Sequence, residues 1–242
     1  MGAVAIAYAR IAPVFYLLPF LNDRVVVGAT LKNTIIFVLI VGLWPAMPHV
    51  PADGGLAVML WLAVKEASVG LALGVTLVLP FWVASAIAEL IDNQRGATIS
   101  DSIDPATGVD ASVLEPFVSL FYAAVFLQQG GMGEIVKALA DSYRYVPVGA
   151  LLQGNVWRIG VMLTDVLGKG ISLAAPVLVM MFLSDVLLGL VSRFCPQVNA
   201  FSLSLSFKSI VAFGVFYLYF AHGLPGPLHE LFDAHPLSTL LR

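Results

Sequence analysis

The residues of this sequence that could do chemistry are a few ionisable side chains inside long apolar stretches. Asp165 and Lys169 stand four residues apart, acid before base, a spacing that favours an ion pair on one face of a helix. The alternative is a proton or ion relay, the use that transporters make of intramembrane acids. The spacing favours the pair, which also lowers the cost of burying both charges.

Asp185 differs from these two residues because no acid or base stands within one helical turn of it. Arg193 is its nearest cation along the helix, about two turns away. Such an acid needs a partner from another helix or subunit, so Asp185 is the best single candidate for assembly or function; a hydrogen-bonded interior Asp is the alternative. Lys65 and Glu66 are adjacent and point to different faces of a helix.

Signatures of enzymes are missing from the chain. It contains neither G-x-S-x-G nor a phosphate-binding glycine loop with its lysine. His229 and Glu230 begin like H-E-x-x-H, but Asp233 stands where the second histidine is required. His229, Asp233 and His235 are metal ligands by type, but a solvated C-terminal tail is the favoured explanation of these residues. We therefore predict no catalytic residue, no cofactor and no metal site.

The elements that must position these side chains are strongly apolar. Hydrophobic residues make up 60% of the 242 residues and charged residues 11%, against about 45–50% and about 25% in soluble domains. So few charges cannot cover a soluble domain of this size, and disorder needs low hydrophobicity. The net charge of −3, with 12 scattered Lys and Arg, excludes a polybasic nucleic-acid binder. The class is a membrane protein or a protein of a membrane-embedded complex.

Apolar stretches of helical length alternate with short polar breaks, which predicts an all-α chain with a single domain over 1–242. The predicted helices cover 3–21, 34–47, 56–91, 113–127, 156–194 and 198–221, and the breaks cover 22–33, 48–55, 92–112 and 128–155. The start of the chain does not resemble a cleaved signal peptide, since Arg10 and Pro13 fall inside its apolar stretch. We expect it to be retained.

Most of these helices are poor independent membrane spans. Within the predicted helices, only 67–88 is free of charges over the roughly 20 residues that a span needs, and Pro80 lies within it. A charge at the centre of a lipid-exposed helix costs about 2.5–3.5 kcal/mol, and even the last apolar stretch contains Lys208. Either the charges face an interior pathway of a bundle, or partner subunits cover the helices.

Small residues and caps predict local packing. Gly70 and Gly74 form a GxxxG pattern that lets two helix backbones approach, either within the chain or at a subunit contact.

Ser112 and Glu115 have the spacing of a capping box at the start of the helix that follows the break 92–112. Alternatively, Glu115 precedes that helix and Pro116 is its first residue.

The most informative stretch is 89–108, which reads ELIDNQRGATISDSIDPATG. Asp104-Pro105 and Thr107-Gly108 are typical of turns. A long polar loop between apolar helices, here 92–112, is more often functional than a short one. Physical reasoning alone allows a lid, a gate or a connector.

The chain resembles the T-type subunit of the bacterial type III secretion export apparatus, the family that includes the flagellar biosynthesis protein FliR. The matching pieces follow one another in order along nearly the whole chain. IDNQRGAT and the later Gly130-Gly131 are more similar to the injectisome branch than to the flagellar branch. The pieces are ARIAPVFYLLPFL (9–21) with Arg24, Lys65-Glu66 with GLALG (70–74), the 89–108 run, Phe126–Gly131 with Ser142-Tyr143 and Pro147, and SRFCPQVNAFSLSLSFK (192–208).

This resemblance implies helical hairpins packed in a hetero-oligomeric export gate of the bacterial inner membrane, within the secretion-system base. The implied partners are the R-type and S-type subunits, the U-type switch subunit, and inner-rod or needle proteins. Unfolded secreted proteins pass through the gate, and membrane lipid surrounds it. Neither an enzymatic activity nor a nucleic acid is implied. Much of the helical mass in such complexes packs on partner subunits, in agreement with the poor spans.

The resemblance also implies that the loop after the Asp-Pro motif helps to close the pore. The matching positions lie around 103–112, where acidic residues would keep the loop hydrated while apolar residues pack in the pore. The implied plug positions are Ile103, Asp104, Pro105, Thr107, Gly108 and Val109.

A second motif that the resemblance singles out joins two helices. Pro196 breaks the helix that ends near Phe194, and Gln197 and Asn199 can satisfy helix-end backbone groups. A conformational corner explains these residues as well as a direct role in the pore does. Cys195, the single cysteine, excludes an intrachain disulfide, and we expect it to be a small buried hydrophobe.

The leading hypothesis is therefore a non-enzymatic subunit of a protein export gate. The alternative is a polytopic small-molecule or ion transporter that uses Asp165, Lys169 and Asp185. Many transporters have two similar halves, and this sequence shows no internal repeat. An intramembrane enzyme is a third class, disfavoured by the missing signatures.

Overall fold

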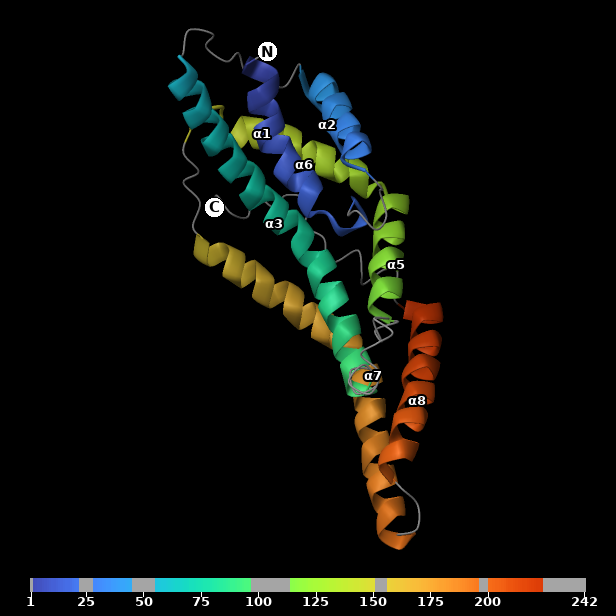
Figure 1. Ribbon diagram of the computed structural model, residues 1–242. Helices are drawn as coiled ribbons and strands as arrows, with labels where there is room; N and C mark the ends of the chain where they lie inside the picture. Colours follow the sequence, from blue (N-terminus) through green and yellow to red (C-terminus); the bar gives the residue numbers. More distant parts are fainter. Residues whose placement is uncertain are drawn as a thin grey trace. The chain divides into compact units, whose positions relative to one another are not determined.

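The computed structural model describes residues 2–21, 28–44, 55–96, 114–150, 156–195 and 200–223. All regular structure within these ranges is helical (Figure 1), which confirms the predicted all-α class. The helices are α1 (Gly2–Leu17), the 3₁₀ turn η1 (Pro19–Leu21), α2 (Ala29–Leu43), α3 (Leu56–Gln94), α5 (Leu114–Gln128), α6 (Gly131–Tyr145), α7 (Val156–Phe194) and α8 (Ala200–Gly223).

Hydropathy predicted most helix bounds within a few residues, and α7 begins and ends where expected. Two predicted breaks were too long. The break 22–33 contains the first turn of α2, and the break 128–155 contains all of α6. Helix α6 was missed because it is amphipathic rather than apolar: Ile135, Leu139 and Tyr143 are buried on one face, while polar residues occupy the other. Helix α3 continues to Gln94, so Asp92 stands on the helix.

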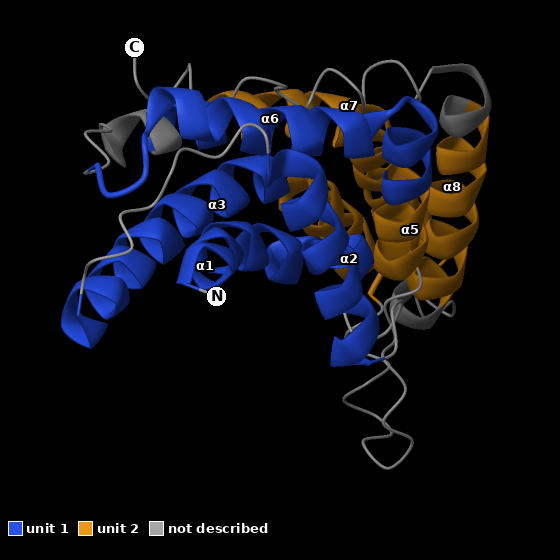
Figure 2. Ribbon diagram, turned by 90° about the horizontal axis from the view of Figure 1, so that it is seen from above, with its two compact units in different colours: residues 1–80, 123–164, 232–242 blue, residues 81–122, 165–231 orange. Residues whose placement is uncertain are grey.

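The described helices pack as two compact units, coloured separately in Figure 2. The first comprises residues 1–80, 123–164 and 232–242, and the second 81–122 and 165–231. Three helices, α3, α5 and α7, contribute to both units.

The first unit is built around a close approach of α1 and α3. A Cβ at Gly70 would collide with the backbone carbonyl of Arg10, and one at Gly74 would lie 3.1 Å from the Cα of Val14. The GxxxG pattern thus serves packing within the chain, the first of the two predicted alternatives. Helix α6 also contacts α1, since Arg10 of α1 donates to Ser142 of α6 and to the carbonyl oxygen of Val146, which follows α6. The fully buried apolar side chains of this core include Ile11, Val14, Phe15, Leu18, Ile36, Ile40, Val69, Leu73, Leu77, Ile135 and Leu139.

The second unit has its own apolar contacts. The rings of Phe81 on α3 and Tyr122 on α5 meet edge to face, with centroids 4.7 Å apart, a favoured aromatic geometry. Gly170 on α7 lies against Val83 and Ile87 of α3, where a Cβ would have no room. These contacts hold α3, α5 and α7 together within the unit.

The two longest helices meet the length and hydropathy requirements of a membrane span: α3, and 160–194 of α7. They differ in what covers them. The most apolar window of α3 is 61% buried inside the chain, whereas that of α7 is 22% buried. Large exposed apolar residues of α7 are Val161, Leu167, Ile171, Val179, Met180, Phe182, Leu183, Val186, Leu187, Leu190, Val191 and Phe194. A patch of this extent marks a surface for lipid or for another protein.

Candidate functional site

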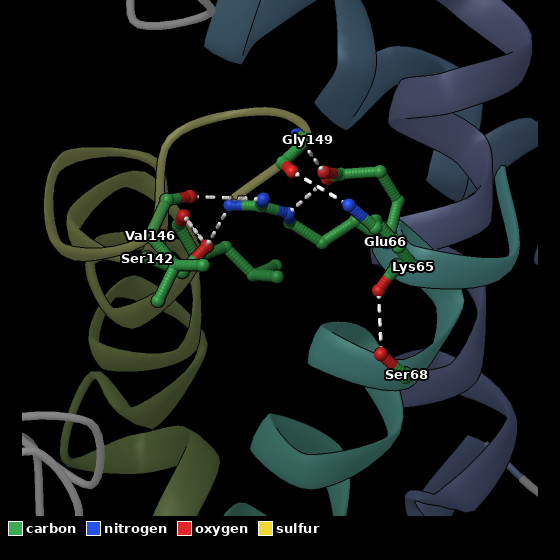
Figure 3. A network of polar contacts seen from close by, with 8 residues as sticks. Lys65, Glu66, Ser68, Ser142, Val146 and Gly149 are labelled. Atoms are coloured by element: carbon green, nitrogen blue, oxygen red, sulfur yellow. Dashed lines mark hydrogen bonds and ion pairs between the residues drawn. The ribbon is translucent and has the colours of Figure 1, made fainter. Parts of the chain in front are cut away.

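The first polar site of the chain is centred on Arg10, an arginine with no exposed surface in the middle of α1. Its Nε donates to Glu66 Oε2 on α3 at 2.6 Å, an ion pair in which both side chains are buried. Nη2 donates to the carbonyl oxygen of Val146 at 2.9 Å, and Nη1 to Ser142 Oγ at 3.4 Å. Figure 3 shows this network. One guanidinium thus joins α1, α3 and the C-terminal end of α6.

Lys65 and Glu66 meet again at Gly149, in the turn that follows α6. The backbone N–H of Gly149 donates to Glu66 Oε1 at 3.1 Å, and its carbonyl accepts from Lys65 Nζ at 3.1 Å (Figure 3). The two adjacent side chains were predicted to point to different faces of the helix, but both reach Gly149, where one binds the carbonyl oxygen and the other the N–H group. Gly149 has φ +82°, a left-handed conformation that favours glycine.

The aromatic ring of Tyr143 also contacts the buried arginine. The guanidinium carbon lies 4.2 Å from the ring centroid, a cation–π contact strengthened by desolvation. The Tyr143 hydroxyl is buried and makes no hydrogen bond with the described residues. Burial raises the pKa of Tyr143 to about 12, so the ring is neutral at physiological pH. The carboxylate of Glu66 therefore balances the charge of Arg10.

The contacts of this site hold helices together and do not form a path for proton transfer. Each donor of Arg10 named above points at an acceptor fixed by a helix or its C-terminal turn. Replacing such a buried pair by apolar groups is often neutral, but removing one partner leaves a buried charge uncompensated. The network therefore fixes the positions of α1, α3 and α6 relative to one another.

The second polar site lies in the other unit and contains Asp185. Lys208 Nζ of α8 lies 2.7 Å from Asp185 Oδ1 of α7, and it also donates to the carbonyl oxygen of Gln94 at the end of α3 at 3.4 Å. The prediction that Asp185 needs a partner from another helix is confirmed, and the partner comes from the same chain.

Asp92 links the end of α3 to the start of α5. Its Oδ2 accepts the backbone N–H groups of Leu114 at 2.8 Å and Glu115 at 3.2 Å, and its Oδ1 accepts Arg95 Nε at 2.6 Å. Asp92 thus caps α5 from another helix. Of the two predicted starts of this helix, the alternative in which Pro116 is the first helical residue was wrong, because α5 already begins at Leu114. Ser112, from the capping-box alternative, lies outside the described residues.

The other predicted charges lie on α7. Lys169 Nζ is 2.9 Å from Asp165 Oδ2, which confirms the ion pair that their spacing predicted. Both side chains remain exposed, by 46% and 63%. The side chain of Arg193 is exposed, and it takes part in none of the ion pairs found between described residues.

Three groups of predicted residues lie outside the described residues. They are the plug positions Ile103, Asp104, Pro105, Thr107, Gly108 and Val109, the corner Pro196, Gln197 and Asn199, and the tail His229, Asp233 and His235. Within the described ranges, no group of three or more His, Cys, Asp or Glu could hold a metal ion.

The expected burial of Cys195 was wrong, because its side chain is exposed. It directly follows the last turn of α7, where Phe194 and Val191 are also exposed. Cys195 therefore lies at an exposed end of α7 rather than in an apolar core.

The residues that sequence reasoning missed are Arg10, Asp92 and the acceptors on and after α6. A signal was present for Arg10, since a charge inside the first apolar stretch needs a buried partner, and Glu66 was available. Nothing in the local sequence indicates that Val146 or Gly149 supplies backbone atoms to that site.

The described residues form an all-helical arrangement with a buried ion pair and broad exposed apolar faces, as expected of an all-α membrane protein. More specifically, the chain belongs to the bacterial export proteins, family 1, whose model matches residues 1–234.

The relatives agree with this assignment. The chain is 42% identical to the surface presentation of antigens protein SpaR of Salmonella typhimurium over 241 residues, covering 99% of this chain and 91% of the relative. It is 30% identical to the Yop proteins translocation protein T of Yersinia pestis over 210 residues (84% and 80%). The flagellar biosynthetic protein FliR of Escherichia coli is 27% identical over 187 residues (76% and 70%). The predicted preference for the injectisome branch is confirmed.

Proposed function

We propose that this chain is a non-enzymatic subunit of a type III protein export gate in the bacterial inner membrane. The observation that carries the proposal is the match to the export family over residues 1–234, together with 42% identity to SpaR over 99% of the chain. The exposed apolar surface of α7 suits a subunit that other helices cover. The partners in this proposal are the R-type and S-type subunits, the U-type switch subunit, and inner-rod or needle proteins.

The transporter alternative receives no support from these relatives, and two contacts disfavour it. A relay needs acids that can gain and release protons along a pathway. Asp165 is instead paired with Lys169, and Asp185 with Lys208. Both pairs have the geometry of structural ion pairs.

The test is co-purification in mild detergent. The tagged chain is expressed with and without the R-type and S-type subunits of its own genome. We expect a discrete hetero-complex that elutes as one species, and aggregation or loss of the chain without partners. A well-behaved solitary protein that ignores both partners would contradict the proposal, and transport assays on Asp165→Asn and Asp185→Asn would follow.

Within this proposal, the connection between α3 and α5 is the plug of the gate. The support is the resemblance of 89–108 to the family motif. Deleting 106–111 should raise the leakage of small solutes through the assembled complex at least severalfold, because the deletion removes Val109 and shortens the connection. A Gly/Ser replacement of the same residues keeps the length and separates the two causes. Leakage that stays unchanged in a fully assembled deletion complex would exclude the plug.

A further inference from the structure

We propose that Asp92 is a positioning residue that fixes both ends of the connection 97–113 at one point. The inference rests on the proposed function for its role in the gate, but its structural part stands on described residues alone. The Asp92 side chain is 2% exposed and stands in the last turn of α3. It bonds the first two backbone N–H groups of α5, although Leu114 is 22 residues further along the chain.

The physical basis is the chemistry of helix ends. The first N–H groups of a helix have no partner inside the helix, and a residue next to the helix usually supplies the acceptor. Here a carboxylate from a different helix does so, and its negative charge also suits the positive end of the α5 dipole. Arg95, three residues along, bonds the other carboxylate oxygen and thereby fixes the orientation of the group.

The end of α3 is itself held by two other helices of the same unit. Lys208 of α8 donates to the carbonyl oxygen of Gln94 and pairs with Asp185 of α7. The Arg95 guanidinium carbon lies 5.3 Å from the centre of the Phe213 ring on α8. The carboxylate of Asp92 therefore attaches the start of α5 to an end of α3 that is itself held by contacts with α8.

This geometry makes a specific prediction for the loss of the carboxylate. The first turn of α5 would lose the acceptor of two N–H groups and fray. Arg95, which follows the last turn of α3, would also lose its carboxylate partner. The ends of the connection would then be free to separate while the remainder of the unit stays folded.

The experiment uses the assembled hetero-complex and measures amide hydrogen exchange in peptides that cover 114–122. Asp92→Ala should accelerate exchange at Leu114 and Glu115 at least tenfold and leave α6 unchanged. Asp92→Asn, which retains an acceptor oxygen, should restore most of the protection. Glu89→Ala is the matched control: it removes an exposed acid from the same helix, one turn earlier, and should change nothing. If Asp92→Ala does not assemble, Asp92→Asn is compared with wild type, and it should show partial acceleration.

Solute leakage through the same complexes separates this inference from the plug. Unchanged exchange in both Asp92 variants overturns the inference, whatever the leakage. Faster exchange with raised leakage supports both proposals. Faster exchange without leakage, in a complex that does leak on deletion of 106–111, overturns the positioning role in the gate. If the deletion does not leak either, the plug fails and the role of Asp92 in joining the two ends stands.

Discussion

Replacing Arg10 with methionine should destabilise the first unit by about 3–5 kcal/mol, the usual cost of breaking a buried ion pair by removing one partner. Methionine keeps much of the length of the arginine but leaves the carboxylate of Glu66 buried without its cation. Ser142 and the Val146 carbonyl lose a donor at the same time. The measurement is thermal unfolding of the purified complex in mild detergent, with the yield of the complex as a second readout.

The matched control is Lys169→Met, which removes the cation of an exposed pair on α7. Exposed pairs contribute roughly 0–1 kcal/mol, so this variant should unfold close to wild type. Glu66→Leu should be as harmful as Arg10→Met. The double variant should cost at least about 2 kcal/mol less than the sum of the singles, since neither charge then remains unpaired. Strict additivity would show that the two residues act independently and would contradict the network.

The second large effect is expected at Gly70, where α3 and α1 approach most closely. Gly70→Ala places a Cβ against the backbone carbonyl of Arg10, which cannot rotate away as a side chain could. Overpacking of a core commonly costs about 1–3 kcal/mol, and more where the neighbour cannot move. We expect a loss of about 3 kcal/mol or more, seen as a lower unfolding temperature and a reduced yield of complex.

Gly168→Ala tests whether this loss reflects the contact rather than the residue type. Gly168 also lies inside an apolar helix, but nothing is within 4 Å of the position that its Cβ would take. Alanine is the better helix former by about 1 kcal/mol, so this variant should be neutral or slightly stabilised. Equal losses in both variants would mean that the GxxxG pattern has no special role in packing α1 on α3.

The sequence predicted those features whose cause is local. The bounds of α7 follow from hydropathy, and the Asp165–Lys169 pair follows from helical spacing. Helix α6 was missed because a search for apolar stretches does not detect an amphipathic helix; its buried residues recur with helical spacing, and periodicity would have found it. The burial of Cys195 was predicted wrongly, because the exposure of a small residue depends on which neighbouring residues cover it.

The sites depend on contacts between distant parts of the chain, which spacing cannot reveal. Asp185 could be recognised as needing a partner, but Lys208 could not be chosen over Arg193 from the sequence. Asp92 could not be recognised as a cap, because the N–H groups that it accepts belong to a helix beyond a long connection. Such pairings are fixed by tertiary packing, so they require coordinates.

The unequal burial of the two longest helices has a consequence for how the complex is made. Most of the apolar window of α3 is buried by contacts within its own chain, whereas most of that of α7 is not. The apolar face of α7 must therefore be in contact with lipid, detergent or another subunit. Exchanging one apolar neighbour for another gains little hydrophobic free energy, so subunit affinity in a membrane comes from close packing and a few polar contacts. Detergent therefore competes with the partners for α7, and we expect subunits synthesised together to assemble more completely than subunits purified apart and mixed.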